Sequence, residues 1–149
     1  MVKEGDKAPD VTLKDMEGVP RRLSDLYGRT WTVVYFYPKD GTSGCTAQAC
    51  TFRDAYQDFT DAGAQVIGIS SDKSSNHSTF ASRYQLPFIL LSDEKGEAKE
   101  LFGVPKSLGF LPGRVTYLID RMGIIRMVFN SQTKIREHIE RTLQYIRSH

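Results

Sequence analysis

Residues 31–50, WTVVYFYPKDGTSGCTAQAC, are the stretch that decides the fold. Residues 31–37 are β-branched or aromatic without alternation, a pattern typical of a strand buried on both faces. Pro38 should end this strand, because proline has no N–H to donate to a neighbouring strand. A helix is expected next, with Thr42 or Ser43 as its cap. Its apolar face would consist of Ala49, Phe52, Tyr56 and Phe59, and Gly63 would end it.

The rest of the chain alternates between strand and helix patterns. Ser74 or Ser75 should cap one further helix, and Gly103 should close another. The expected strands are 9–13, 19–23, 64–70, 87–92, 114–120 and 124–130, and the expected further helices are 74–85, 94–103 and 133–148.

This order of elements predicts a single α/β domain over residues 1–149. A mixed central sheet should be flanked by helices on both faces, and the hairpin at 114–130 should supply an antiparallel pair. The loop before this hairpin, 103–113, has an apolar tip at Phe110 and Leu111. The pattern is compatible with a thioredoxin-like fold that carries an N-terminal β extension.

The composition is that of an ordinary globular protein, with 149 residues, 40% of them hydrophobic and 26% charged. A formal net charge of +2 gives no electrostatic footprint for nucleic acid or an anionic membrane. No run approaches the ~18 apolar residues of a membrane span, and the N-terminus, MVKEGDKAPD, lacks the apolar core of a signal peptide. We therefore expect a soluble, cytoplasmic protein without nucleic-acid or membrane partners.

The two cysteines of the chain, Cys45 and Cys50, are its strongest functional signal. Two cysteines do not suggest the disulfide framework of a small secreted domain. Cys45 should lie in the first turn of the predicted helix, where unpaired N–H groups and the positive end of the helix dipole would stabilise a thiolate. Because the preceding strand ends at Pro38, this sulfur should lie at the carboxyl edge of the sheet, where open α/β folds bind ligands.

The spacing of the cysteines restricts how they can react with each other. On an intact helix, Cα atoms five positions apart are about 8.6 Å distant, whereas a disulfide needs less than about 7 Å. The first turns would have to unwind before the two sulfurs could bond, and Gly44 and Thr46 are weak helix formers. Our hypothesis is a nucleophile held by a helix that melts to admit its partner. The spacing alone is equally consistent with two inert buried cysteines.

Neither a metal nor a cofactor is expected. The imidazole donors are His77, His138 and His149, and none lies near the cysteines in a metal-ligand spacing.

Residues 37–54, YPKDGTSGCTAQACTFRD, resemble the active-site segment of the peroxiredoxins, with Pro38, Thr42 and Cys45 in the pattern P-x-x-x-T-x-x-C. The second cysteine five positions later resembles that of the Q subfamily, also called bacterioferritin comigratory protein. The resemblance covers nearly the whole chain and points especially to cyanobacterial and plastid members. The other matching segments are GAQVIGISSD at 63–72, LPFILLSDE at 86–94, FGVP at 102–105 and LPGRVTYLID at 111–120.

The resemblance implies a thiol-dependent peroxidase that reduces hydrogen peroxide and alkyl hydroperoxides. It implies that Cys45 is the peroxidatic cysteine and Cys50 the resolving cysteine, which forms an intramolecular disulfide. Thr42, Pro38 and Arg114 would complete the pocket. Thioredoxin or a similar dithiol would be the reductant, the protein would be a monomer, and a plastid location would apply if a transit peptide was removed. Without the resemblance, Thr42 is more simply a helix cap, Pro38 a strand terminator and Arg114 a surface charge.

Two other functional classes remain open. One is a redox-switched binding module, in which helix melting alters the affinity for a partner. The other is a thiol–disulfide exchange protein without peroxide specificity. In a peroxidase, most of the acceleration should come from fixed donors that stabilise the breaking O–O bond, here Arg114, Thr42 and the N–H groups near Cys45. Exchange needs no such donors, so the arrangement argues against that class.

Overall fold

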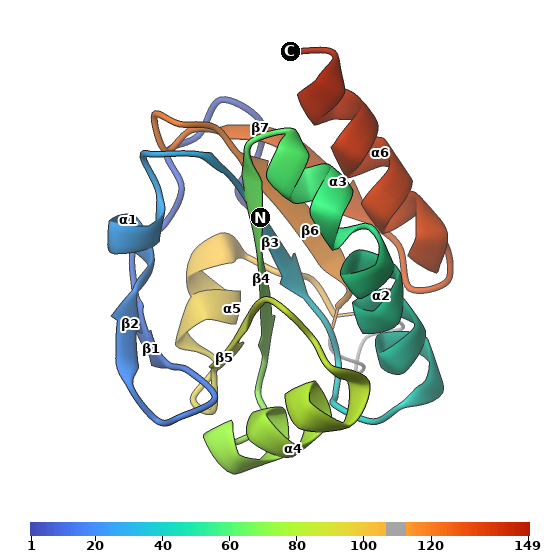
Figure 1. Cartoon of the computed structure of the whole chain (residues 1–149). Coiled ribbons are helices and arrows are strands. Elements are labelled where there is room, and N and C mark those ends of the chain that lie inside the picture. The colour runs from blue at the N-terminus through green and yellow to red at the C-terminus, as the bar shows by residue number, and fades with distance from the viewer. Residues whose placement is uncertain (107–112) are drawn as a thin grey trace.

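The computed structural model describes residues 1–106 and 113–149 of the chain. Within them, the strands form one mixed sheet in the order β2-β1-β5-β4-β3-β6-β7 (Figure 1). The strands are β1 (Thr12–Lys14), β2 (Pro20–Arg22), β3 (Trp31–Phe36), β4 (Ala64–Ser70), β5 (Ile89–Ser92), β6 (Val115–Ile119) and β7 (Ile125–Asn130). The helices are α1 (Leu23–Leu26), α2 (Ser43–Asp54), α3 (Tyr56–Asp61), α4 (Ser74–Tyr84), α5 (Glu97–Phe102) and α6 (Ile135–Arg147).

Strand β3 lies inside the sheet because its side chains are apolar on both faces. It pairs in parallel with β4 and antiparallel with β6. Val33 and Tyr35 belong to one hydrophobic core, and the alternating Val34 and Phe36 belong to a second. The strand expected at 31–37 is confirmed, one residue shorter than predicted.

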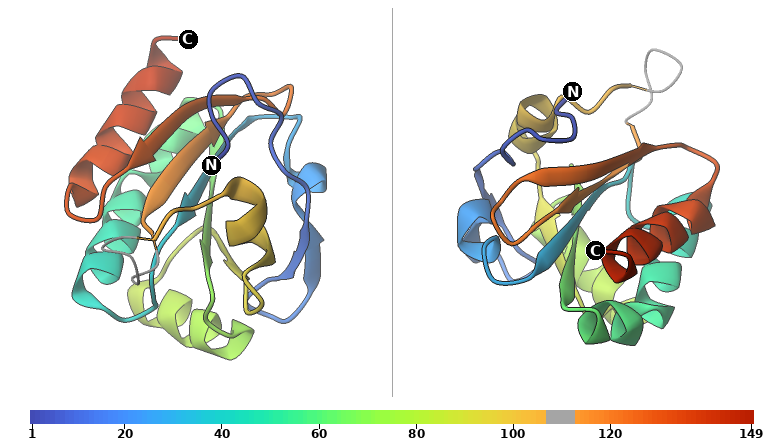
Figure 2. Two further views of the ribbon diagram at one scale, coloured as in Figure 1. Left: turned by 180° about the vertical axis from the view of Figure 1, so that it is seen from behind. Right: turned by 90° about the horizontal axis from the view of Figure 1, so that it is seen from above.

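The two cores lie on opposite faces of the sheet, and each is covered by its own helices, as the view from above in Figure 2 shows. Helices α2, α3, α4 and α6 cover the first core, to which they contribute Phe52, Phe59, Phe80 and Ile139, among others. Helices α1 and α5 cover the second core with Leu23 and Phe102. The predicted α/β architecture with helices on both faces is therefore confirmed.

The N-terminal strands form an antiparallel pair at one edge of the sheet, where Leu13 of β1 lies opposite Arg21 of β2. Strand β1 also pairs with β5 through Lys14 and Ser92. The short helix α1 follows β2 directly and was not predicted, because four residues are too few to show a helical period.

The helix expected to run to Gly63 is interrupted, which corrects the sequence prediction. Ala55, with φ −92° and ψ 2°, separates α2 from α3. Phe52 and Phe59 lie on either side of this break, and their ring centroids are 5.8 Å apart. Both aromatic rings belong to the same core.

The predicted helix caps are only partly correct. Thr42 occupies the N-cap position of α2, but its side chain makes no cap hydrogen bond and donates instead to the carbonyl oxygen of Lys39 at 3.0 Å. Helix α4 begins after Lys73, which is extended and accepts a hydrogen bond from the backbone of His77. Ser74 and Ser75 therefore lie inside α4 and do not cap it.

The apolar loop tip predicted at Phe110 and Leu111 lies outside the described residues. No helix in the described ranges is both long enough and apolar enough to cross a membrane.

Candidate active site

The sulfur of Cys45 lies in the first turn of α2, the helix that follows β3. Thr42 is the N-cap, so Cys45 is the third residue of the helix. The side chain is almost wholly buried, with 1% of its surface exposed, and belongs to the core beneath α2. The predicted position of this thiol in the first turn is confirmed.

The side chain that meets this sulfur is Arg114, which directly precedes β6. Because β6 pairs with β3, Arg114 enters the site from the neighbouring strand. Its Nη2 donates to the Sγ of Cys45 at 3.5 Å. Arg114 is itself buried, with 4% exposed, which excludes the simpler interpretation of a surface charge.

Two neighbours fix the guanidinium of Arg114 in place. Nη1 donates to the Oε1 of Gln48 at 2.6 Å, and Nε donates to the carbonyl oxygen of Gln132 at 3.2 Å. Gln48 is fully buried and lies one turn after Cys45 on the same face of α2. This role of Gln48 was not predicted from the sequence. The three-residue spacing showed that it shares a face with Cys45, but not that it meets Arg114.

Gly44 provides the space in which the guanidinium lies. A Cβ atom added at this position would be 3.1 Å from the Nη2 of Arg114. The sequence marks this glycine as a weak helix former. Its position shows a second role, because the absence of a side chain lets Arg114 approach the first turn of α2.

A second buried side chain near Arg114 is that of His138. The Nδ1 of His138 accepts from the hydroxyl of Thr116 at 2.7 Å, and its Nε2–H donates to the carbonyl oxygen of Ser131 at 2.7 Å. Burial lowers the pKa of His138 from 6.5 to about 4; the positive charge of Arg114 acts in the same direction, against the raising effect of the Ser131 contact. The positive charge at this site is therefore that of Arg114 alone among these residues.

The structure does not bring the remaining predicted site residues, Thr42 and Pro38, into hydrogen-bond contact with the sulfur of Cys45. The hydroxyl of Thr42 is directed to the carbonyl of Lys39, and the Thr42 side chain is exposed. Pro38 is half-buried at the end of β3. Both lie in the segment that leads into α2, and their roles stay predictions.

Cys50 lies on the same unbroken helix as Cys45, and both thiols are free. It is half-buried, whereas Cys45 is buried. With α2 intact the geometry of a helix keeps the two Cα atoms about 8.6 Å apart, too far for a disulfide. The contact of Cys45 with Arg114 also argues against an inert cysteine.

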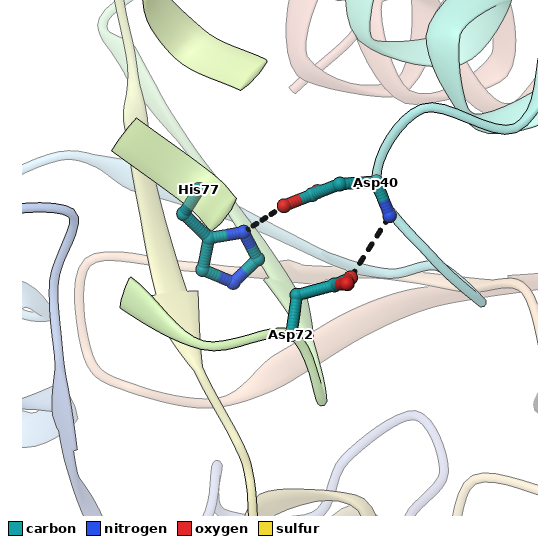
Figure 3. A group of neighbouring side chains, drawn as sticks. All are labelled: Asp40, Asp72 and His77. Atoms are coloured by element: carbon teal, nitrogen blue, oxygen red, sulfur yellow. Dashed lines mark hydrogen bonds and ion pairs between the residues drawn. The ribbon is translucent and has the colours of Figure 1, made fainter. Parts of the chain in front are cut away.

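A second polar cluster includes Asp40, which lies in the turn before α2. Figure 3 shows its members, Asp40, Asp72 and His77. One ligand atom from each lies within 4.8 Å of the others, so this is the group in the described residues that could hold a metal ion. In the sequence, His77 is only one of three isolated imidazole donors. Nothing in the spacing of 40, 72 and 77 shows that they meet.

The comparisons with known proteins agree with this geometry. Residues 4–128 match the AhpC/TSA family. Peroxiredoxin Q of Sedum lineare, named as chloroplastic, is 50% identical over 148 residues, which are 99% of this chain and 79% of that protein.

Solved structures agree as well. Peroxidoxin BcpB from Mycobacterium tuberculosis superposes with a TM-score of 0.92 at 36% identity, covering 99% of this chain and 98% of the other. A bacterioferritin comigratory protein of Xanthomonas campestris, studied for alkyl peroxide reduction, gives a TM-score of 0.84 at 28% identity, covering 93% of this chain and 91% of the other.

Proposed function

The chain belongs to the AhpC/TSA family and, within it, to the peroxiredoxin Q proteins, which makes it a thiol peroxidase, and we propose that Cys45 is its attacking thiolate and Cys50 its resolving thiol. The observation that carries this assignment is the contact between the Nη2 of Arg114 and the Sγ of Cys45. A buried cation next to a sulfur favours the thiolate, which is the nucleophilic form of cysteine.

In the first step, the thiolate of Cys45 attacks one oxygen of a hydroperoxide. An S–O bond forms, the O–O bond breaks, and the other oxygen leaves as an alkoxide or hydroxide that takes up a proton. Cys45 becomes a sulfenic acid. Arg114 is held by Gln48 and Gln132, so its N–H groups are already oriented towards the charge that develops on the peroxide oxygens. Thr42 and Pro38, at the start of α2, are proposed to complete the pocket.

In the second step, Cys50 attacks the sulfenic sulfur, a disulfide forms and water leaves. This step needs the first turns of α2 to unwind, because the intact helix keeps the cysteines apart. Gly44 and Thr46 lower the cost of unwinding, since both are weak helix formers. A dithiol reductant of the thioredoxin type then restores the two thiols through a mixed disulfide.

The test is the oxidation of the reduced protein with one equivalent of hydrogen peroxide. Peptide mapping by mass spectrometry should find a Cys45–Cys50 disulfide. Cys50→Ser should stop at the sulfenic acid of Cys45, and Cys45→Ser should abolish peroxide consumption. Full turnover by Cys45→Ser would reject the proposal.

Arg114→Met separates a peroxidase from a general exchange protein. This variant should lose peroxide reactivity at least tenfold more than its reactivity towards a small aromatic disulfide, because only the O–O bond needs the guanidinium. Equal losses with the two substrates would favour the exchange protein. Gel filtration of the reduced protein tests the expected monomer, and the chloroplastic names of the plant relatives support the plastid alternative to the cytoplasm.

A further inference from the structure

The buried imidazole of His77 faces a hydrogen-bond acceptor on each side. Its Nδ1 lies 2.6 Å from the Oδ2 of Asp40, and its Nε2 lies 3.0 Å from the carbonyl oxygen of Leu91 (Figure 3 shows the first contact). The His77 side chain is fully buried, and the Asp40 side chain is 7% exposed. Asp40 belongs to the turn between β3 and α2, five residues before Cys45.

With Asp40 as a carboxylate, these contacts are satisfied by two protons on the ring. A neutral imidazole has one N–H and one lone pair, so it can satisfy only one of two acceptors. Turning the ring over would place carbon atoms at both contacts and lose both. The arrangement is satisfied when His77 is an imidazolium and Asp40 a carboxylate, which is a charge-assisted hydrogen bond.

His138 shows the opposite arrangement in the same protein. Its Nδ1 faces a hydroxyl donor, Thr116, and only its Nε2 faces a carbonyl. Both contacts are satisfied by a neutral ring. The contacts of His77 are therefore satisfied by two ring protons, whereas those of His138 are satisfied by one.

The other groups that face His77 and Asp40 complete a closed network. The hydroxyl of Tyr37 donates to the Oδ1 of Asp40 at 2.5 Å and lies 3.4 Å from the Nδ1 of His77. The backbone N–H of Asp40 donates to the Oδ2 of Asp72 at 2.8 Å, and the hydroxyl of Ser70 donates to the same oxygen at 2.6 Å. Both ring nitrogens and both Asp40 oxygens thus have partners, so the cluster is a hydrogen-bonded network and not an open metal site.

The charged residues around this network are few. Lys39 and Arg83 line a cavity of about 240 Å³ together with Asp40 and Asp72. Lys73 contributes only its backbone carbonyl, which accepts from the N–H of His77. The acidic groups Asp40 and Asp72 are therefore the charges in direct hydrogen-bonded contact with this network.

We propose that protonated His77 is a positioning residue for Cys45, which it serves by fixing Asp40 and with it the turn that leads into α2. This inference rests on the proposed peroxidase function of Cys45. The His77–Asp40 contact joins the turn to α4, and the Asp72 contact joins it to the segment after β4. The segment that must unwind in the second step is thus anchored at its N-terminal end, so Cys45 can return to Arg114 after reduction.

Asp40→Asn replaces the contact between Asp40 and His77 with one that needs no second proton on the ring. The Asn amide can donate to a neutral Nδ1, its oxygen can accept from Tyr37, and Nε2–H can still donate to Leu91.

The experiment combines nitrogen NMR of the ring with kinetics. In the reduced wild-type protein at pH 7, both ring nitrogens of His77 should have the ¹⁵N shifts of an imidazolium, whereas His138 should show one unprotonated nitrogen. In Asp40→Asn, His77 should become neutral with an unprotonated Nδ1. An unprotonated Nδ1 in the wild type would overturn the proposal, because Asp40 would then carry the proton. This readout does not depend on peroxidase activity, so it separates a failure here from a failure of the proposed function.

The kinetic arm measures the rate of peroxide reaction with Cys45 at pH 7. His77→Gln, which cannot bridge both acceptors in the same way, should lower this rate about tenfold through misplacement of the sulfur. Asp40→Asn should keep the rate within about threefold, because the Asn amide preserves a hydrogen bond to His77. Asp54→Asn, an exposed carboxylate on α2, is the matched control and should behave as the wild type. A folded His77→Gln with the wild-type rate would reject the proposal.

Discussion

The Nη1 of Arg114 donates a 2.6 Å hydrogen bond to the Oε1 of Gln48, three residues after Cys45 on α2. Helix α2 therefore carries both the sulfur and the amide that orients the cation facing it. Unwinding of this part of the helix would separate Cys45 from Arg114 and release the guanidinium from its partner at the same time. The orientation of Arg114 in the reduced site therefore depends on an intact helix α2.

Gln48→Leu should lower kcat/KM for hydrogen peroxide by about 10- to 100-fold. The change removes a buried hydrogen bond to a charged group, which is worth about 1.5–3 kcal/mol, and leaves Arg114 free to turn from the sulfur. Steady-state assays with a thioredoxin system measure the loss.

Gln57→Leu is the matched control. Gln57 is exposed on α3, where its side chain donates to Asp61 at 2.8 Å, so its loss should leave kcat/KM unchanged. Gln48→Glu keeps an acceptor for Arg114 and should recover part of the activity. Wild-type kcat/KM in a folded Gln48→Leu would show that Arg114 needs no such support.

Gly44→Ala should separate activity from stability. The new Cβ would lie 3.1 Å from the Nη2 of Arg114, so the guanidinium would have to move by a few tenths of an ångström from Cys45. We expect kcat/KM to fall about tenfold, because catalysis is sensitive to small displacements. Thermal stability should be equal to that of the wild type or higher, since alanine is the better helix former.

Ala47→Gly provides the opposite change on the same helix. Ala47 is exposed, and glycine costs up to about 1 kcal/mol of helix stability there. This variant should melt at a lower temperature and keep its rate of reaction with peroxide. A Gly44→Ala variant with full activity would show that Arg114 adjusts to the added methyl group without loss.

The sequence predicted the parts of this site that depend on local pattern. The apolar run at 31–37 predicted β3, and the turn residues after Pro38 placed Cys45 at the start of a helix. The partner of Gln48 was not predictable, because Arg114 is 66 residues away and meets it only through the pairing of β6 with β3. Only the family resemblance pointed to Arg114.

The break at Ala55 was likewise not predictable from the local pattern. The helical spacing of apolar residues continues through this position, so periodicity alone predicts one helix. The structure shows that Arg53 donates to the carbonyl oxygen of Tyr84 at 2.8 Å, which ties the end of α2 to the end of α4. A contact between segments this far apart in the chain leaves no mark on the local pattern.

Arg53 should limit how far α2 unwinds when the disulfide forms. Its contact with Tyr84 anchors the last turn of the helix, beyond Cys50. Hydrogen exchange followed by mass spectrometry should show that oxidation removes amide protection over residues 43–50 and retains it over 52–54. Arg53→Met should extend the loss to 52–54. Equal protection of the two ranges in the oxidised wild type would contradict this limit.

His138 should make the protein less stable in mild acid. Burial lowers the pKa of this histidine to about 4 in the folded protein, against 6.5 for an ordinary imidazole. Between these values the unfolded chain binds the extra proton, so the free energy of unfolding falls as the pH decreases from 6.5 to 4 and is independent of this group above 6.5. The loss at pH 4 amounts to about 3 kcal/mol.

His138→Gln should remove this part of the pH dependence. Glutamine can still accept from Thr116 and donate to Ser131, but it does not titrate. Urea unfolding followed by the fluorescence of Trp31, the single tryptophan, gives the free energy at each pH. Between pH 6.5 and 4 the wild type should lose about 3 kcal/mol more than His138→Gln, while the carboxylates contribute equally to both. His149→Gln, at the exposed C-terminus, should follow the wild type. Parallel curves for the wild type and His138→Gln would mean that the buried imidazole is protonated at no extra cost in the folded protein.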